Sequence, residues 1–239
     1  MKTISSIALL LLFFYSNPNG TKPSMTDAEE VRIGEVLAKD FERQEGIQPT
    51  PQSIKIDAYL QNVGDKVAAN ARRKLPYRFH FDPSPTFHSA VALPGGQIYV
   101  GAGILAYIDT EDQLATVLGH EIEHVALNQC RDRLAEVLSK EHLSANDADK
   151  LKVDPFLNSY GHDNEFAADR EGVLLALKAG YSADAAIRLL RTFIILGEQM
   201  PDTPKEEKAN LEARIEQILA VRHSSNLPKP AKETALALP

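Results

Sequence analysis

The chain has 239 residues, of which 44% are hydrophobic and 25% charged, an ordinary globular composition that suits one domain with a sizeable core. Its formal net charge of −7 and pI near 5.5 argue against a nucleic-acid-binding surface, and no basic run interleaved with aromatic residues occurs. A single cysteine, Cys130, excludes an intramolecular disulfide and a cysteine-rich metal site.

Residues 1–20, MKTISSIALLLLFFYSNPNG, have the layout of a secretory signal peptide: a lysine at position 2, an uncharged apolar run, then polar turn-forming residues. The apolar run is shorter than the roughly 20 residues of a membrane-spanning helix. We therefore expect a signal peptide or N-terminal anchor, and an exported chain that is periplasmic or attached to the membrane on its periplasmic side.

The next elements are two helices and a small sheet. Residues 26–44 begin with a Thr–Asp cap and an acidic first turn, and residues 54–74 carry apolar residues at helical spacing and end in ARRK. Residues 77–82 alternate as a strand. Residues 87–93 and 97–105 are predicted as two short strands joined by the turn PGG.

Helices dominate the remainder, and their predicted ranges are 111–127, 130–140, 163–179, 182–196 and 206–221. Residues 144–163 form a polar, proline-containing loop. The tail, residues 222–239, lacks periodicity and is predicted to be disordered. The expected fold class is α+β and mainly helical, with a small central sheet, in one domain over residues 26–221.

The stretch ATVLGHEIEHVA places two histidines on a helix that otherwise has an apolar core face. His120 and His124 lie about 40° apart around the helix and one turn apart along it, so their rings can converge as half of a zinc site. Glu121 follows the first histidine and can act as general base, as in the H-E-x-x-H arrangement. Glu123 falls opposite the core face and is predicted to be solvated. The alternative is two histidines that pack with polar partners and bind no metal.

A catalytic zinc site takes three protein ligands and keeps one position for water, so a third ligand is expected downstream. Residues 164–172, NEFAADREG, place Glu165 and Asp169 four apart on one helix face. We expect Glu165 to bind the metal and Asp169 to accept the other ring N–H of a ligand histidine. An acidic helix N-terminus is the alternative, and it accounts for one carboxylate only. Nitrogen and oxygen ligands of this kind favour zinc.

Three stretches, residues 90–105, 111–125 and 164–172, match the M48 peptidases in order and separation. The sequence resembles this family of gluzincin-type zinc proteases over about residues 26–221. The resemblance implies a zincin-like metallopeptidase domain, in which the hairpin packs on the H-E-x-x-H helix, with one Zn²⁺ per chain.

The resemblance also implies site roles. The zinc ligands are His120, His124 and Glu165, the general base is Glu121, and Asp169 supports a ligand histidine. The strand that borders the cleft, where an extended substrate pairs with its edge, comprises Gln97, Ile98, Tyr99 and Val100. A histidine-proline signature of the family is replaced here by DTPKEEKANLEARIEQI, so the residue that stabilises the oxyanion stays open among His162, Tyr160 and His223.

The expected function is hydrolysis of peptide bonds in protein or peptide substrates, in envelope protein quality control. The alternative is a zinc-stabilised chaperone-like or binding module, whose site is covered by loop 144–163. No nucleic-acid partner is expected, and membrane association would come through the N-terminal segment.

Overall fold

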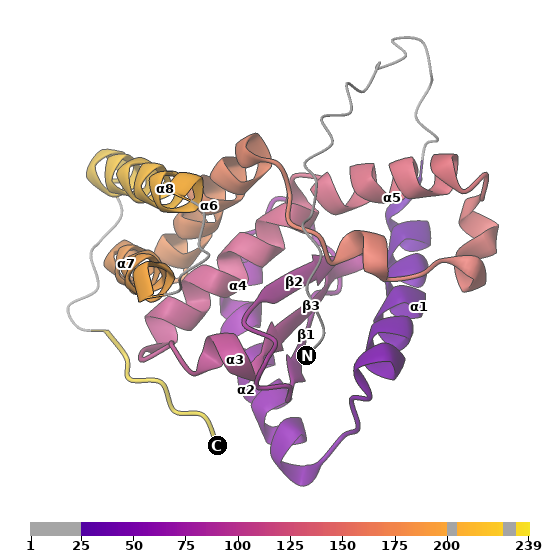
Figure 1. Cartoon of the computed structure of the whole chain (residues 1–239), viewed down its shortest axis with the longest axis horizontal. Helices are drawn as coiled ribbons and strands as arrows, with labels where there is room; N and C mark the ends of the chain where they lie inside the picture. The colour runs from indigo at the N-terminus through magenta and orange to yellow at the C-terminus, as the bar shows by residue number, and fades with distance from the viewer. Residues whose placement is uncertain (1–24, 200–204, 227–232) are drawn as a thin grey trace, which may run out of the picture.

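The computed structural model describes residues 25–199, 205–226 and 233–239 (Figure 1). The helices are α1 (Asp27–Glu45), α2 (Pro51–Ala68), α3 (Ala102–Leu105), α4 (Glu111–Ala126), α5 (Gln129–Lys140), α6 (His162–Lys178), α7 (Ala183–Gln199) and α8 (Lys205–Ser224). The strands are β1 (Arg78–Asp82), β2 (Ala90–Leu93) and β3 (Gln97–Gly101). The predicted α+β, mainly helical class is confirmed. The expected signal peptide, residues 1–20, lies outside the described residues.

Three helices, α1, α2 and α4, begin at a threonine cap. Thr110 caps α4: its hydroxyl accepts from the backbone N–H of Gln113, whose side chain accepts from the backbone N–H of Thr110. The second helix ends at Ala68, earlier than its sequence pattern suggests. Arg73 lies beyond it and donates instead to the carbonyl of Val125 at the end of α4, so tertiary contacts override the local helical preference.

The sheet has the strand order β1-β3-β2, with β3 parallel to β1 and antiparallel to β2. The expectation that Gln97, Ile98, Tyr99 and Val100 offer a free edge is wrong, because these residues pair with a strand on each side. Among the described residues, the sheet edge next to the site belongs to β2. The sequence predicted the hairpin of β2 and β3, but nothing in it indicated that β1 pairs with β3.

Helix α4 is the central element of the fold. Its side chains Leu114, Leu118 and Ile122 are fully buried with residues of α2 and the sheet in one core cluster, and α6 crosses its other side. The crossing is close: a Cβ on Gly172 would lie 2.6 Å from the carbonyl carbon of Gly119. Glycine at both positions therefore permits the approach of the two helices on which the site is built.

The prediction of a solvated Glu123 is wrong. This side chain is 2% exposed, because α2, α6 and the sheet all pack against α4. Its Oε2 lacks a hydrogen-bond partner among the described residues, and the nearest cation, Arg72, lies 3.8 Å away. Burial raises the pKa of Glu123 to about 7.

Two further layers flank α4 (Figure 1). Helices α6, α7 and α8 share a core cluster on one side. Helices α1 and α5 share another with the loop 144–163, which contains the 3₁₀ turns Ala145–Lys150 and Asp154–Phe156 and buries Val153 and Phe156. The predicted polar loop is thus anchored in the core by its few apolar residues.

The C-terminal tail differs from the predicted disorder of residues 222–239. Helix α8 continues to Ser224, and residues 233–239 dock on the start of α4. The backbone N–H of Glu111 donates to Thr234, that of Leu236 donates to Asp109, and Leu236 and Leu238 pack against the core. The alternating apolar residues in ETALALP are the sequence feature that could have predicted this extended, docked segment.

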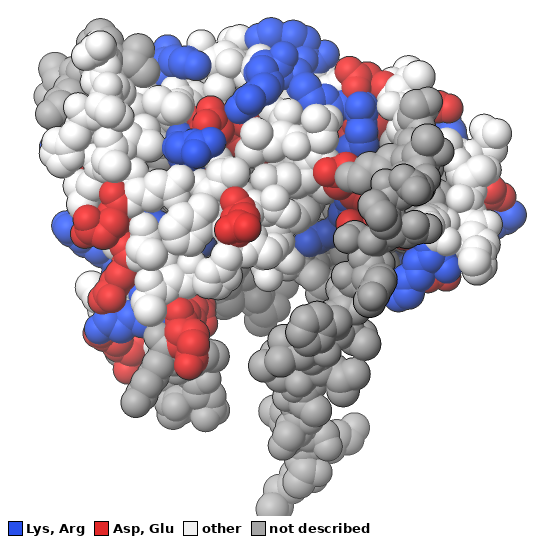
Figure 2. Space-filling model, turned by 90° about the horizontal axis from the view of Figure 1, so that it is seen from above, with Lys and Arg blue, Asp and Glu red and all other residues white. Residues whose placement is uncertain are grey.

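The face seen from above in Figure 2 carries basic and acidic side chains next to one another, with wide uncharged areas between them. Among the described residues, no helix combines the length and apolar character needed to cross a membrane.

Replacing Gly172 with alanine tests the α4–α6 crossing. Alanine normally stabilises a helix interior by about 0.5–1 kcal/mol relative to glycine, but here its Cβ overlaps the backbone of α4. We expect Gly172→Ala to lower the free energy of unfolding by about 1–3 kcal/mol, measured by urea denaturation. Gly161→Ala is the control, since no atom lies within 4 Å of its added Cβ. An unchanged or increased stability of Gly172→Ala would contradict the close crossing.

Candidate metal centre and active-site cleft

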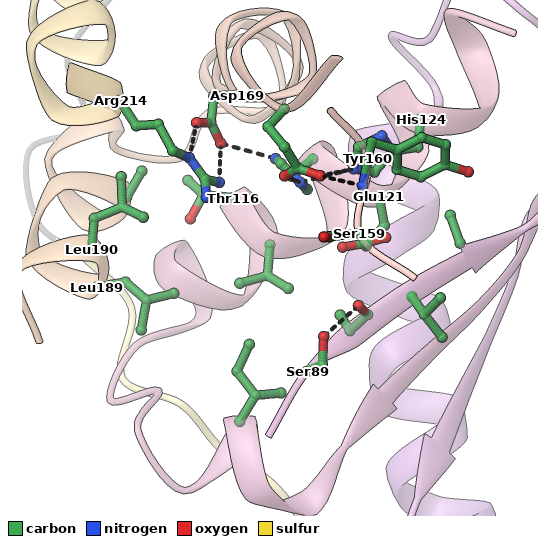
Figure 3. A pocket seen from close by; sticks show the side chains of 18 of the residues that line it. Ser89, Thr116, Glu121, His124, Ser159, Tyr160, Asp169, Leu189, Leu190 and Arg214 are labelled. Atoms are coloured by element: carbon green, nitrogen blue, oxygen red, sulfur yellow. Dashed lines mark hydrogen bonds and ion pairs between the residues drawn. The ribbon is translucent and has the colours of Figure 1, made fainter. Parts of the chain in front are cut away.

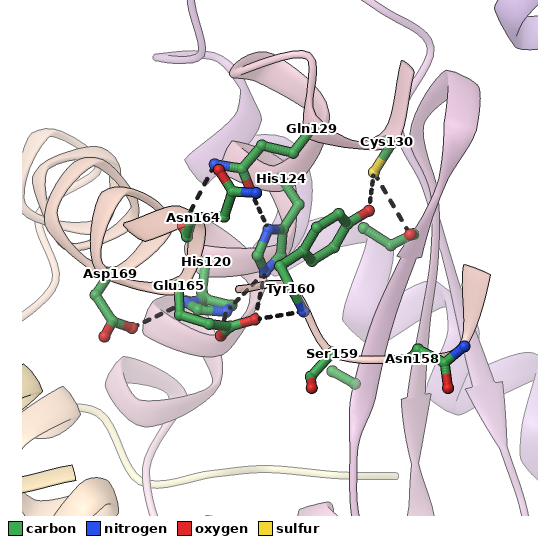
Figure 4. Close-up of polar contacts among 12 residues, drawn as sticks. His120, His124, Gln129, Cys130, Asn158, Ser159, Tyr160, Asn164, Glu165 and Asp169 are labelled. Carbon is green, nitrogen blue, oxygen red and sulfur yellow. Dashed lines mark hydrogen bonds and ion pairs between the residues drawn. The ribbon is translucent and has the colours of Figure 1, made fainter. Parts of the chain in front are cut away.

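The two histidines of α4 direct their rings to one point, as their spacing predicts. The Nε2 atoms of His120 and His124 lie 2.9 Å apart. The carboxylate of Glu165, in the first turn of α6, lies 3.3 Å from Nε2 of His120 and 3.9 Å from Nε2 of His124 (Figure 4). The structure thus brings the three residues predicted as ligands into one cluster.

The other ring nitrogen of each histidine is held by a separate partner. Nδ1 of His120 lies 2.9 Å from Asp169, one turn after Glu165 on α6. Nδ1 of His124 lies 2.6 Å from Oε1 of Gln129, at the start of α5. Because both Nδ1 atoms face an oxygen acceptor, each ring presents Nε2 as the lone-pair nitrogen of a ligand when it is neutral. Asp169 lies where the sequence placed it, whereas Gln129 carried no signal in the sequence.

The electrostatics of the cluster favour a positive charge on one of the two histidines, His120, beside the ionised carboxylate of Glu165. Burial disfavours a charged His120, but the hydrogen bonds with Asp169 and Glu165 outweigh it and raise the pKa of His120 to about 10. Burial and the neighbouring His120 lower the pKa of His124 to about 3. Burial likewise opposes ionisation of Glu165, yet the bond with His120 lowers the pKa of Glu165 to about 2.

These residues fit a zinc ion. A tetrahedral ion with bonds of about 2.05 Å separates its ligand atoms by about 3.3 Å. The two Nε2 atoms lie 2.9 Å apart, and the two oxygens of Glu165 lie 3.3 Å from one of them and 3.9 Å from the other, which are separations of that size. A divalent cation also supplies the positive charge that the proton on His120 now provides. Two imidazoles and one carboxylate are a ligand set typical of catalytic zinc.

Glu121 follows His120 on α4 and lines the same cleft. Its side chain is 7% exposed. Burial raises the pKa of Glu121 to about 7, although the charge on His120 opposes this shift. A carboxyl group with a pKa near neutrality can accept a proton and release it again, which is what a general base needs.

Sequence reasoning missed Arg214. This residue of α8 donates two hydrogen bonds to Asp169, one of them 2.8 Å long from Nη2, and lines the cleft (Figure 3). The bonds with Arg214 and His120 hold the pKa of Asp169 well below its usual range despite burial. Arg214 thereby extends the chain of contacts from His120 to a third helix. A single arginine in a charged helix gave no sequence signal for this role.

The three candidates for oxyanion stabilisation have different locations. Tyr160 lines the cleft, with its ring stacked on His124 at 4.3 Å, but its hydroxyl donates to Sγ of buried Cys130. His162 and His223 are exposed and do not line the cleft. The hydroxyl of Tyr160 therefore binds Cys130 and not a group at the metal centre. Neither His162 nor His223 lies at the metal centre.

The cluster lies in a cleft of about 350 Å³. One wall is residues 89–92, which include the start of β2, and another is residues 157–160 of the loop. The expected cover by loop 144–163 is thus limited to this second wall. The third wall is apolar and comes from α6, α7 and α8 (Figure 3).

Comparison with known proteins agrees with this geometry. The family model described as Peptidase family M48 matches residues 55–226. The mitochondrial metalloendopeptidase OMA1 of Schizosaccharomyces pombe is 28% identical over 170 residues, which cover 66% of this chain and 50% of that protein. Its namesake in Saccharomyces cerevisiae is 24% identical over 195 residues, covering 72% and 55%.

The beta-barrel assembly-enhancing protease of Escherichia coli K12 is 24% identical over 123 residues, covering 51% of this chain and 24% of that protein. The chain thus spans between 24% and 55% of the lengths of these three relatives. Since the family match includes the cluster on α4 and α6 and covers more than half of the chain, this chain belongs to peptidase family M48.

Proposed function

We propose that this protein is a zinc-dependent endopeptidase that hydrolyses peptide bonds of protein substrates. The observation that carries the proposal is the convergence of two Nε2 atoms and one carboxylate in a cleft that also contains Glu121. This combination provides ligands for a metal, a general base and space for substrate at one place.

In this mechanism His120, His124 and Glu165 would hold the zinc ion. Zinc, when bound, supplies Lewis acidity that makes water a nucleophile near neutral pH and polarises a substrate carbonyl. Glu121 takes the proton from the attacking water at its carboxylate and delivers it to the leaving nitrogen. Asp169 and Arg214 keep the ring of His120 in place during both transfers.

The backbone of the substrate has a place next to these groups. Strand β2 pairs only with β3, so no strand among the described residues lies along its other edge, and residues 90–92 line the cleft. An extended peptide can add to that edge by main-chain hydrogen bonds. We therefore propose that β2, and not the strand with Gln97, pairs with an extended substrate.

We place this activity in envelope protein quality control, in an exported protein. Support comes from the signal-like composition of residues 1–20 and from one relative that is a beta-barrel assembly-enhancing protease. Membrane association through the same N-terminal segment belongs to this proposal.

A zinc-stabilised binding module is the second candidate. Tyr160 favours it, because its ring stacks on His124 and the guanidinium of Arg133 lies over the Tyr160 ring, 3.8 Å from the ring centroid. A segment anchored in this way can restrict access to the metal. The two candidates differ in whether the function requires proton transfer by Glu121: the endopeptidase requires it and the binding module does not.

Replacing Glu121 with glutamine distinguishes them. We expect Glu121→Gln to keep one zinc per chain by elemental analysis and to lose peptide cleavage by at least about a hundredfold, since general base catalysis contributes 10²–10⁴-fold. His124→Ala and Glu165→Ala should lose zinc, because each removes one of three ligands. Cleavage by Glu121→Gln at the parental rate would reject the proposed mechanism, and equal function of both proteins in cells would favour the binding module.

Replacing Arg214 with glutamine tests its support of the metal centre. The change leaves Asp169 without its cationic partner, so the ring of His120 is less firmly held, and we expect zinc affinity to fall by about 10–100-fold. Competition with a chelator measures this affinity. Arg222→Gln is the matched control on α8, because Arg222 pairs only with Asp184 at the surface in the described contacts. Equal affinities of the two variants would show that Arg214 acts elsewhere.

Removing the hydroxyl of Tyr160 tests whether this group stabilises the oxyanion. Since the hydroxyl donates to Cys130, we expect Tyr160→Phe to keep kcat within about threefold of the parent, well below the 10²–10³-fold loss typical of an oxyanion donor. Steady-state kinetics on a cleaved peptide provide the measurement. A hundredfold loss of kcat with zinc retained would show that the hydroxyl of Tyr160 does stabilise the oxyanion.

A further inference from the structure

The carboxylate of Glu165 is held by the backbone of the segment that precedes α6. Its Oε1 accepts a hydrogen bond from the backbone N–H of Tyr160 at 3.1 Å, and its Oε2 lies 3.3 Å from Nε2 of His120 (Figure 4). The two oxygens of this candidate metal ligand therefore differ. Oε1 is bonded to a main-chain donor, whereas Oε2 is the oxygen nearer to the imidazole with which it would share the cation.

The peptide group that supplies this N–H is held from its other side by Arg133 of α5. Nη2 of Arg133 donates to the carbonyl of Ser159 at 3.0 Å, and Nη1 donates to the carbonyl of Asn158. The carbonyl of Ser159 and the N–H of Tyr160 belong to one trans peptide plane, in which the C=O and N–H bonds point in opposite directions. Because Arg133 fixes the carbonyl on its own side, the N–H is directed toward Glu165.

The ring of Tyr160 fixes the same segment a second time. It stacks on the ring of His124 with the centroids 4.3 Å apart, and the guanidinium of Arg133 lies 3.8 Å from its centroid. Two groups this close to one centroid cannot share one face of a ring, so the tyrosine lies between the cation and the imidazole. A guanidinium is attracted to the face of an aromatic ring. Arg133 therefore holds the segment at two carbonyls and at one ring.

We propose that Arg133 is a positioning residue for the metal ligand Glu165, acting through the peptide group between Ser159 and Tyr160. The proposal rests on the proposed zinc-dependent function, and it adds a residue that does not itself line the cleft. With Oε1 bonded to the N–H, only Oε2 is available to the cation, so the carboxylate takes one ligand position. A fourth position then stays open for water, as a catalytic zinc site requires. Without Arg133 the peptide group can rotate, and both oxygens can turn to the ion.

The bond from Tyr160 to Glu165 also satisfies a backbone N–H at the start of α6, where Gly161 has no side chain to cap the helix. A loss of this capping would lower the free energy of unfolding. It would not change the ligands of an ion bound to the folded protein. The test therefore measures the surroundings of the ion as well as stability and activity.

The test compares the full chain with Arg133→Met, which removes every donor of this side chain but keeps an unbranched residue that suits a helix. Both proteins are saturated with Co²⁺, whose visible absorption reports the number and geometry of its ligands. We expect weaker visible bands for Arg133→Met, because a carboxylate that binds through both oxygens adds a ligand. With zinc, the variant should keep one ion per chain and lose about 10–100-fold in kcat, the range typical of residues that orient metal ligands.

Lys140→Met is the matched control, because it removes one positive charge from an exposed position at the end of the same helix. It should keep the parental spectrum and kcat. Arg133→Lys keeps the charge but lacks the planar fork that reaches two carbonyls and the ring together. We expect it to change the spectrum in the same direction as Arg133→Met and by no more, so the proposal stays testable if Arg133→Met fails to fold.

The outcomes separate this proposal from the proposed function. A changed spectrum in Arg133→Met, with a parent that cleaves no peptide, would keep the positioning role and reject the peptidase function. A parental spectrum in folded Arg133→Met, with a parent that cleaves peptide, would reject the positioning role and keep the peptidase. An equal change in Lys140→Met would also overturn the proposal, because it would show that the charge of α5 acts at a distance and not through the peptide group.

Discussion

The close crossing of α4 and α6 is the constraint on which the site depends. Helices usually approach to 8–10 Å, depending on the side chains at the contact, and paired glycines at positions 119 and 172 allow the backbones to touch here. Glu165 and Asp169 lie on α6 within the two turns before Gly172, and His120 follows Gly119 directly. The crossing therefore sets the distance from the carboxylates to the imidazoles, and no local feature of either helix could set it alone.

Burial of so many ionisable groups is tolerable only because their charges alternate. From Arg214 to Asp169, His120 and Glu165, each group contacts one of opposite sign, and each pKa moves in the direction that keeps the charged form. A buried ion pair with one member missing is strongly destabilising. The series ends at Glu165 and His124, where a cation can complete it, so the same interactions that permit folding also favour metal binding.

The sequence predicted what helix periodicity alone determines. The spacing of His120 and His124, and of Glu165 and Asp169, follows from 3.6 residues per turn, and the structure places all four together. The sequence could not predict features that depend on residues far away along the chain. Arg214 contributes from α8, β1 decides which strand of the hairpin is the edge, and α2 and α6 bury Glu123. Each of these outcomes requires the tertiary arrangement, which no single stretch of residues encodes.

The fold separates the metal-binding cluster from the other walls of the cleft. The imidazoles, Glu121 and the two carboxylates lie on α4 and α6, which meet at a rigid glycine contact. The remaining walls come from β2, residues 157–160, α7 and α8, which approach the centre from different directions. Side chains on these walls can vary without moving the metal ligands, because the ligands are positioned by α4 and α6 and oriented by Asp169 and Gln129. Selectivity in such a domain can therefore change while the chemistry at the centre stays the same.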